Sequence, residues 1–369
     1  MRKTTHGARQ QPSAVAGERT FRLASAEDRA GMQQLRITVL IPTYKRPVLL
    51  RAALESVRNQ SRLDLIAAVI VSENSSDPGS EEICGDFSDL PIRFVRQTVA
   101  LETYCHIARI VELAETEHVA LLGDDDMWGR YHIEEAARQL SAHQNAVAYI
   151  GGAAIVSDSS RAICSQYQLV AQSRIPPYSD RFTDCWVWSA QEMLLASLLC
   201  TPLNMWAIVG RRDKLLKAME VFTEPNQGID ADRIMIWELS RLGEIVIGRE
   251  MSLFYRVHGD NACARLFAES PSHHRQASHA YTKRMLQEAS DMGIDARALW
   301  LDMISRMTPQ QWNDVRNFQG NVEGSRDALV AAWGDDAGHP RNPDLKAIVR
   351  DIPPPFLHRA LARIMRKTT

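Results

Sequence analysis

The run His118-Val119-Ala120-Leu121-Leu122-Gly123-Asp124-Asp125-Asp126 joins a short apolar segment to three consecutive aspartates. Val119 to Leu122 is apolar and partly β-branched, which is typical of a strand buried on both faces. Three carboxylates at the end of such a strand repel one another unless a cation is present, and hard divalent cations favour oxygen ligands. Because open α/β sheets bind ligands at this edge, the run predicts a metal-dependent site that handles phosphate. The alternative is a solvated turn that leads into the next helix.

The sequence on both sides of this run predicts strands that alternate with helices. We expect strands at residues 37–41, ended by Pro42, and at 67–71, 92–95, 119–122 and 147–150, with helices at 50–57, 102–115 and 131–143. This alternation implies right-handed βαβ units and a mostly parallel sheet. The first 155 residues or so are therefore predicted to form an α/β domain of the nucleotide-binding type.

The second half of the chain is less regular. We expect helices at residues 189–199 and 232–242, and strands at 203–209, 244–248 and 251–257. After about Leu266 the chain is predicted to be helical and polar. Residues 1–35 are polar and lack periodicity, so we expect them to form a flexible extension.

Composition excludes several classes of protein. The chain has 369 residues, 45% of them hydrophobic, and a formal net charge of −2, which gives no reason to expect a nucleic-acid partner. Its six cysteines form no CxxC pair, so they are interpreted as free thiols in a reducing compartment and not as disulfides or a zinc site. No secretory signal is apparent, and no apolar stretch reaches the roughly 20 residues of a membrane helix. We therefore expect a soluble, cytoplasmic protein.

Four motifs occur in order along the chain. They are Ile41-Pro42-Thr43-Tyr44-Lys45-Arg46-Pro47, the acidic turn at 72–79, the run at 119–126, and Tyr255-Arg256-Val257-His258-Gly259-Asp260-Asn261. Together they resemble a family 2 glycosyltransferase of GT-A fold, over roughly residues 36–261. The resemblance implies a GT-A domain at 36–265, whose part at 36–155 binds the nucleotide sugar and whose part at 156–265 binds the acceptor. It leaves 266–369 as a helical extension.

The resemblance implies a nucleotide-binding loop after the first strand. Pro42, Thr43 and Tyr44 belong to this loop, and Arg46 adds a phosphate contact; the alternative is that the prolines only stiffen it. Glu73 stands where the family usually has an aspartate that reads uracil or ribose.

The acidic run departs from the family at Gly123, where an aspartate is usual. The working pair is then Asp125, as metal ligand, and Asp124, on the ribose or on a water bound to the metal. Asp126 is expected to support the other two or to cap the following segment. The implied metal is Mg²⁺ or Mn²⁺, which would bridge the diphosphate and neutralise charge on the leaving group.

Two further segments complete the predicted site. Asp232 occupies the position of the general base, with Asp230 as the second candidate, while helix capping is the alternative role. His258 is expected to close over the metal or the diphosphate, and Arg256 to bind diphosphate or to pair with a carboxylate. Three tryptophans form either a stacking platform for an acceptor sugar or part of the core: Trp186, Trp188 and Trp206.

The implied function is an inverting glycosyltransferase. It would move a sugar from a nucleotide-diphospho-sugar, most simply a UDP-sugar, to a hydroxyl of a saccharide or lipid-linked acceptor. A catalytically silent nucleotide-sugar-binding module remains an alternative, as does a sugar-phosphate nucleotidyltransferase, although that class needs a glycine-rich loop near the first strand. The basic amphipathic segment at 356–369 suggests peripheral membrane contact at the inner face of the membrane, or else a solvated terminal helix.

Overall fold

The predicted motifs lie along a curled central sheet. The computed structural model describes residues 35–157, 162–164, 185–199, 203–223, 231–258, 271–307 and 322–333. Within these residues the strands are β1 (Ile37–Thr43), β2 (Ile66–Glu73), β3 (Ile92–Arg96), β4 (His118–Leu121), β5 (Met127–Trp128), β6 (Ala146–Ser157), β7 (Ala162–Cys164), β8 (Cys185–Trp188), β9 (Ile208–Arg211) and β10 (Glu244–Val257). Their order is β3-β2-β1-β4-β9-β6-β10-β5, with β7 beside β6 and β8 beside β10.

Parallel pairing dominates the half of the sheet that carries the site. Strands β3, β2, β1 and β4 run parallel to one another, and β6 is parallel to β10. The short strand β9 lies between these two groups and is antiparallel to both β4 and β6. The expected α/β class with a mixed, mostly parallel sheet is therefore confirmed.

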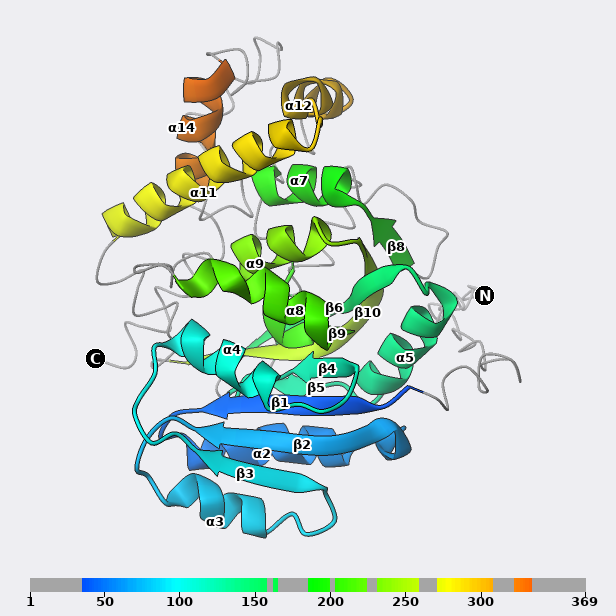
Figure 1. Ribbon diagram of the computed structural model, residues 1–369, viewed down its shortest axis with the longest axis vertical. Helices are drawn as coiled ribbons and strands as arrows, with labels where there is room; N and C mark the ends of the chain where they lie inside the picture. The colour runs from blue at the N-terminus through cyan, green and yellow to red at the C-terminus, as the bar shows by residue number, and fades with distance from the viewer. Residues whose placement is uncertain are drawn as a thin grey trace, which may run out of the picture.

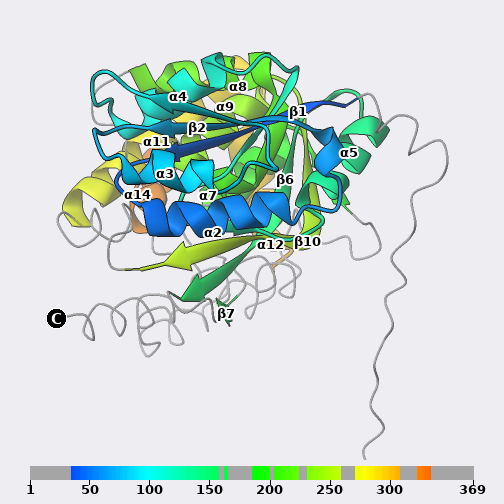
Figure 2. The same ribbon diagram turned by 90° about the horizontal axis from the view of Figure 1, so that it is seen from below.

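Helices cover both faces of the sheet. They are α2 (Pro47–Arg58), α3 (Gly79–Gly85), α4 (Thr103–Glu112), α5 (His132–Ala142), α7 (Ala190–Leu199), α8 (Arg212–Met219), α9 (Ala231–Ser240), α11 (Pro271–Asp291), α12 (Ala296–Ser305) and α14 (Val322–Trp333), with 3₁₀ turns η1 (Leu63–Leu65), η2 (Met205–Ala207) and η3 (Glu220–Thr223). Figure 2 shows α4, α8 and α9 along one face and α2 along the other. In Figure 1, α11, α12 and α14 stack beyond α7, at the opposite end of the molecule from β3 and α3.

One hydrophobic core joins these layers. Val39 and Leu40 of β1 and Val119 of β4 have no exposed surface, as expected for strands covered on both faces. The same cluster includes Met285 of α11 and Trp300 of α12. The described helices after residue 270 thus share the core of the sheet domain.

Several elements differ from the sequence-based prediction. Strand β1 continues through Pro42 to Thr43, because β4 pairs with β1 only as far as Leu40, and Pro42 therefore lies where β1 has β2 as its one paired strand. Strand β10 is continuous, and register shifts between Ile247 and Leu253 accommodate the residues that suggested a break. In place of a strand at 203–209 the chain forms η2 and then β9, since Asn204 caps the backbone N–H of Trp206. The prediction missed α3, α8 and β8.

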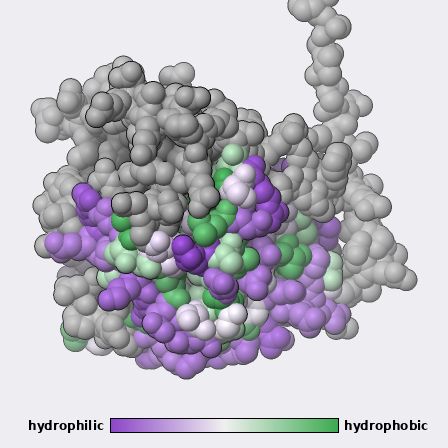
Figure 3. Space-filling model, turned by 90° about the horizontal axis from the view of Figure 1, so that it is seen from above, coloured by the Kyte–Doolittle hydropathy of each residue, from purple (hydrophilic) through white to green (hydrophobic). Residues whose placement is uncertain are grey.

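Two of the segments predicted from the sequence belong to parts of the chain that the structure does not describe. The predicted flexible extension and the basic segment at 356–369 lie outside the described residues, apart from Leu35. No helix in the described part of the chain is both long enough and apolar enough to span a membrane. On the face drawn in Figure 3, hydrophilic residues predominate and hydrophobic residues are dispersed among them.

Substitution of Gly248 tests the packing between β10 and β6. A Cβ atom at this position would lie 2.1 Å from the Tyr149 hydroxyl oxygen and 2.6 Å from its Cζ atom, and Tyr149 is fully buried. We expect Gly248→Ala to lower the free energy of unfolding by about 1–3 kcal/mol, because the buried ring must shift. Gly85→Ala is the matched control, since its Cβ atom would meet nothing within 4 Å. Equal stability of the two variants in urea unfolding would contradict this account.

Candidate active site

Strand ends bring the predicted motifs together. Thr43 and Glu73 are register partners at the ends of β1 and β2, and Leu40 of β1 pairs with Leu121 of β4, just before the acidic run. Because these strands are parallel, all three ends meet at one edge of the sheet. The end of β10, followed by His258, approaches the same acidic run.

The acidic residues are largely buried. Asp124 is 6% exposed, Asp125 is 9% exposed and Asp126 is not exposed at all. Arg46 lies across the first two: its guanidinium Nη1 is 3.3 Å from Asp124 Oδ1 and 2.7 Å from Asp125 Oδ2. The backbone N–H of Tyr44 also donates to Asp124 Oδ2, at 3.3 Å. The loop after β1 therefore contacts the acidic run directly.

The end of β10 fixes the run from the other side. The backbone N–H of Arg256 donates to Asp126 Oδ1 at 2.9 Å, and its guanidinium Nε donates to the carbonyl of Asp125 at 3.0 Å. His258 Nε2 lies 3.0 Å from Asp125 Oδ2. The structure therefore brings Arg46, Asp124, Asp125, Arg256 and His258 into one cluster.

Gly123 has a steric explanation. A Cβ atom at this position would lie 3.1 Å from Asp126 Oδ2 and 3.4 Å from the Trp206 ring. A side chain at residue 123 would therefore require the carboxyl groups of Asp125 and Asp126 to shift slightly. The side chain of Asp126 thus takes up space beside residue 123.

Buried negative charge sets the electrostatics of the cluster. Burial, and next the charge of Asp125, raise the pKa of Asp124 to about 6, although Arg46 opposes the shift. Burial and Asp125 also raise the pKa of Asp126 well above its ordinary value. No described donor reaches Asp126 Oδ2, so Asp126 is suited to a protonated, structural role. Asp124 and Asp125 remain as the acidic pair that a cation would stabilise.

The chain offers two neighbouring ligand atoms for a metal. Asp125 Oδ2 and His258 Nε2 approach each other closely, and oxygen with imidazole nitrogen suits Mn²⁺ and, less well, Mg²⁺. Among the described residues, no group of three or more His, Cys, Asp or Glu side chains is arranged to hold a metal ion. Asp124 instead accepts hydrogen bonds from Tyr44 and Arg46. A metal at this site would thus need further ligands from the substrate or from water.

Glu73 lies at the same edge but is fully buried. Its Oε2 accepts a hydrogen bond from the Ser80 hydroxyl at 2.5 Å, and its Oε1 accepts one from the Ser75 hydroxyl at 2.6 Å. These two serine contacts were not predicted from the sequence. Asp77 stabilises the turn that follows β2, since its Oδ1 accepts a hydrogen bond from the N–H of Gly79.

Asp232 lies in the first turn of α9, beside the 3₁₀ turn η2. The backbone N–H of Met205 lies 3.5 Å from Asp232 Oδ2, while the next residue, Trp206, packs against Gly123. The turn η2 therefore lies between Asp232 and the acidic run. Asp230 is outside the described residues.

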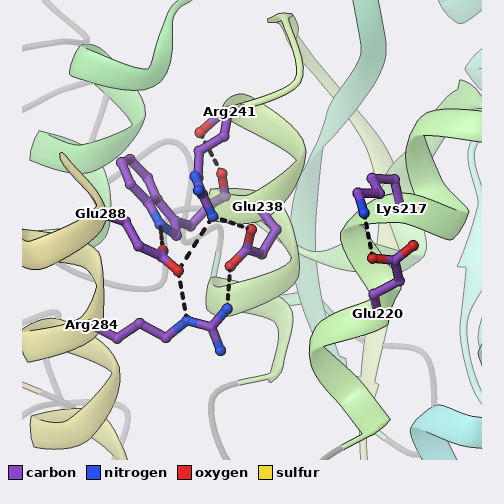
Figure 4. Close-up of polar contacts among 8 residues, drawn as sticks. Lys217, Glu220, Glu238, Arg241, Arg284 and Glu288 are labelled. Carbon is purple, nitrogen blue, oxygen red and sulfur yellow. Dashed lines mark hydrogen bonds and ion pairs between the residues drawn. The ribbon is translucent and has the colours of Figure 1, made fainter. Parts of the chain in front are cut away.

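Polar contacts fasten α9 to α11, as Figure 4 shows. Glu288 accepts hydrogen bonds from the Trp237 indole at 2.7 Å and from Arg284 Nε at 2.9 Å. Glu238 accepts from Arg284 Nη2 at 2.8 Å and from Arg241 Nη1 at 2.6 Å. Directly after Asp232 in the first turn of α9, the buried Arg233 donates to Ser278 and Thr282 of α11. The helix that carries Asp232 is therefore held by the C-terminal region.

The three tryptophans have different environments. Trp186 and Trp188 are 6% and 1% exposed on β8, which confirms the core interpretation for both. Trp206 is half-buried, and its carbonyl accepts a hydrogen bond from the Trp128 indole at 2.9 Å. Only Trp206 of the three adjoins the acidic run.

Comparison with known proteins agrees with this geometry. Residues 38–183 match the family model described as Glycosyl transferase family 2. Over this region the chain is similar to family 2 glycosyltransferases. A stretch of 93 residues is 31% identical to abequosyltransferase RfbV of Salmonella typhimurium. That match covers 24% of this chain and 28% of the relative, so the chain aligns with little more than a quarter of that protein.

Solved structures show the same fold. S. aureus TarS 1–349 has a TM-score of 0.50 at 11% identity, and its complex with UDP-GlcNAc has a TM-score of 0.51 at 10% identity. Each comparison covers 82% of this chain and 88% of the TarS chain. The expected GT-A fold is confirmed.

The raised pKa of Asp124 predicts a specific pH dependence. Between the ordinary value of 3.8 and about 6, the folded protein binds more protons at Asp124 than the unfolded chain does. The contribution of Asp124 to stability is therefore present below pH 3.8 and is lost as the pH rises through about 6. Asp124→Asn cannot ionise, so we expect it to gain stability relative to the metal-free wild type as the pH rises from about 4 to 7.

The measurement is urea unfolding across that pH range, without divalent metal. Asp89→Asn is the matched control, because Asp89 is exposed on the surface. A stability difference between wild type and Asp124→Asn that does not change with pH would contradict the buried-charge account.

Removal of Glu288 tests the attachment of α9 to α11. Glu288→Ala leaves the Trp237 indole N–H and two arginines without this acceptor, so we expect a loss of about 1–3 kcal/mol in the free energy of unfolding. The ion pair of Lys217 with Glu220, also drawn in Figure 4, has both side chains more than 60% exposed. Glu220→Ala should therefore change stability by less than about 0.5 kcal/mol. If both variants lost a similar free energy of unfolding, the α9–α11 contacts would stabilise the protein no more than an exposed ion pair does.

Proposed function

We propose that this chain is an inverting glycosyltransferase that uses a nucleotide-diphospho-sugar, with a UDP-sugar as the first candidate donor. The acceptor is a hydroxyl of a saccharide or of a lipid-linked saccharide. The observation that carries the proposal is the acidic pair Asp124–Asp125 at the carboxyl edge of the sheet, contacted by Arg46 and His258 from two different strand ends. Such a cluster suits a diphosphate with its cation.

The donor would lie across the ends of β1, β2 and β4. Pro42, Thr43 and Tyr44 line the first of these ends, and Tyr44 is 53% exposed, so it is accessible to a nucleotide. Arg46 would exchange its aspartate contacts for the negative diphosphate, while Asp124 would meet the ribose. The TarS fragment with the same fold was solved with UDP-GlcNAc, which supports UDP as the first nucleotide to test.

In this proposal a divalent cation, Mg²⁺ or Mn²⁺, would lie beside Asp125 and His258. When bound, it would neutralise charge on the departing nucleoside diphosphate. Asp125 and His258 would hold it, with the diphosphate and water as the remaining ligands. Arg256 contributes by fixing Asp125 and Asp126, since its contacts are to the acidic run itself.

Asp232 is the proposed general base. It would remove the proton from the acceptor hydroxyl as that oxygen attacks the anomeric carbon, on the face opposite the leaving diphosphate, so the configuration inverts. The turn η2 supports this role because it places the Met205 N–H beside Asp232 and the Trp206 ring beside the acidic run.

Two substitutions test these roles. With a panel of nucleotide sugars and acceptor saccharides, we expect Asp232→Asn to reduce kcat by about 10²–10⁴-fold while nucleotide binding is retained, because only proton transfer is lost. Asp125→Asn should abolish the stimulation by Mn²⁺ and weaken nucleoside diphosphate binding. NMR of the product's anomeric configuration reports inversion.

The control is Asp89→Asn, which should match wild type. Unchanged turnover in both Asp125→Asn and Asp232→Asn would refute the assignments. Nucleotide-sugar binding by wild type without turnover would instead favour the silent binding module, and release of pyrophosphate would indicate a nucleotidyltransferase. Membrane contact through residues 356–369 and a cytoplasmic location remain predictions, since that segment lies outside the described residues.

A further inference from the structure

We infer that Glu73 is a positioning residue that shapes the nucleotide-binding loop, and that it does not read the base. This inference rests on the proposed function, because the loop in question is the one assigned to the nucleotide. It departs from the role that the family resemblance gives to this position. The departure matters because it removes the residue on which base selectivity was expected to depend.

Three donors of the chain itself occupy the Glu73 carboxylate. The hydroxyls of Ser75 and Ser80 donate to its two oxygens at 2.6 and 2.5 Å, and the backbone N–H of Lys45 donates to Oε1 at 3.3 Å. Both Glu73 and Ser80 have no exposed surface. A base edge would have to displace these donors to reach the carboxylate, and breaking hydrogen bonds to a buried charge is costly.

The hydrogen bond from the Lys45 N–H to Glu73 links this carboxylate to the conformation of the loop. Lys45 has φ = 56°, a left-handed conformation that a non-glycine side chain disfavours. Such a conformation persists only where surrounding contacts enforce it. The neighbours of Lys45 make the functional contacts, since the Tyr44 N–H and the Arg46 guanidinium both reach Asp124. Glu73 thereby fixes the turn that directs Arg46 toward the acidic pair.

The length of the side chain fits this role. Glu73 ends β2 and must reach both the turn after β1 and Ser80 in the first turn of α3. Glutamate is one methylene longer than the aspartate usual in the family, so its carboxylate can extend to both elements. Restoring aspartate should shorten this reach and loosen the loop.

Hydrogen exchange measures the loop without any ligand. We expect Glu73→Gln and Glu73→Asp to accelerate exchange of the Tyr44 and Lys45 amides about tenfold, because a charge-assisted hydrogen bond is weakened. Glu82→Gln is the matched control, as Glu82 is an exposed glutamate on the same helix that carries Ser80. Ser80→Ala should act in the same direction as the Glu73 variants, with a smaller effect, and it provides a milder test if either of them unfolds.

Calorimetry with UDP, CDP, GDP and ADP separates positioning from base reading. If Glu73 positions the loop, both Glu73 variants weaken every nucleotide that binds by a common factor, and the ratios among the Kd values stay as in wild type. Unchanged amide exchange in Glu73→Gln and Glu73→Asp would overturn the inference. It would also be overturned if Glu73→Gln altered those ratios more than about fivefold while Ser80→Ala did not. If wild type binds none of the four nucleotides, the proposed function fails, and the exchange data still decide the role of Glu73.

Discussion

The burial of adjacent carboxylates at the end of β4 is the constraint on which the site depends. Asp124 and Asp125 lie side by side with little exposure to water, and their mutual repulsion has to be offset. Arg46 supplies a positive charge from the loop after β1, and His258 supplies an imidazole from the end of β10. The loop and the strand end are thus arranged around one excess of negative charge. Such a charge suits a divalent cation, and a bound cation would in turn attract a diphosphate.

A second chain of contacts links the acidic run to the C-terminal region. Trp206 of η2 packs against Gly123, the N–H of Met205 meets Asp232, and α9 is fastened to α11 by the Glu238 and Glu288 network. The position of Asp232, the proposed general base, is therefore set by residues beyond the region that matches the family model, which ends at 183. The helical region predicted as an extension contributes to the site in this way.

Much of the fold could be predicted from local pattern. The strands β1, β2, β3 and β4 are short apolar runs, and their bounds differ from the prediction by two residues or fewer. The pattern failed where tertiary contacts override it. Pro42 and Gly248 indicated strand ends, yet pairing with β2 and β6 carries both strands past these residues. Strand β8, which was missed, has only four residues and pairs with the distant strand β10.

The sequence by itself determined the α/β class, the acidic run at the end of a buried strand and the membership of its neighbours in one site, because strand period and motif order are local properties. Only the tertiary structure decided what each acidic residue does. Asp126 is buried against Gly123, Glu73 is occupied by the Ser75 and Ser80 hydroxyls, and Asp124 and Asp125 face Arg46. The physical reason is that burial and hydrogen-bond partners set the charge and accessibility of a carboxylate, and both come from residues distant in sequence.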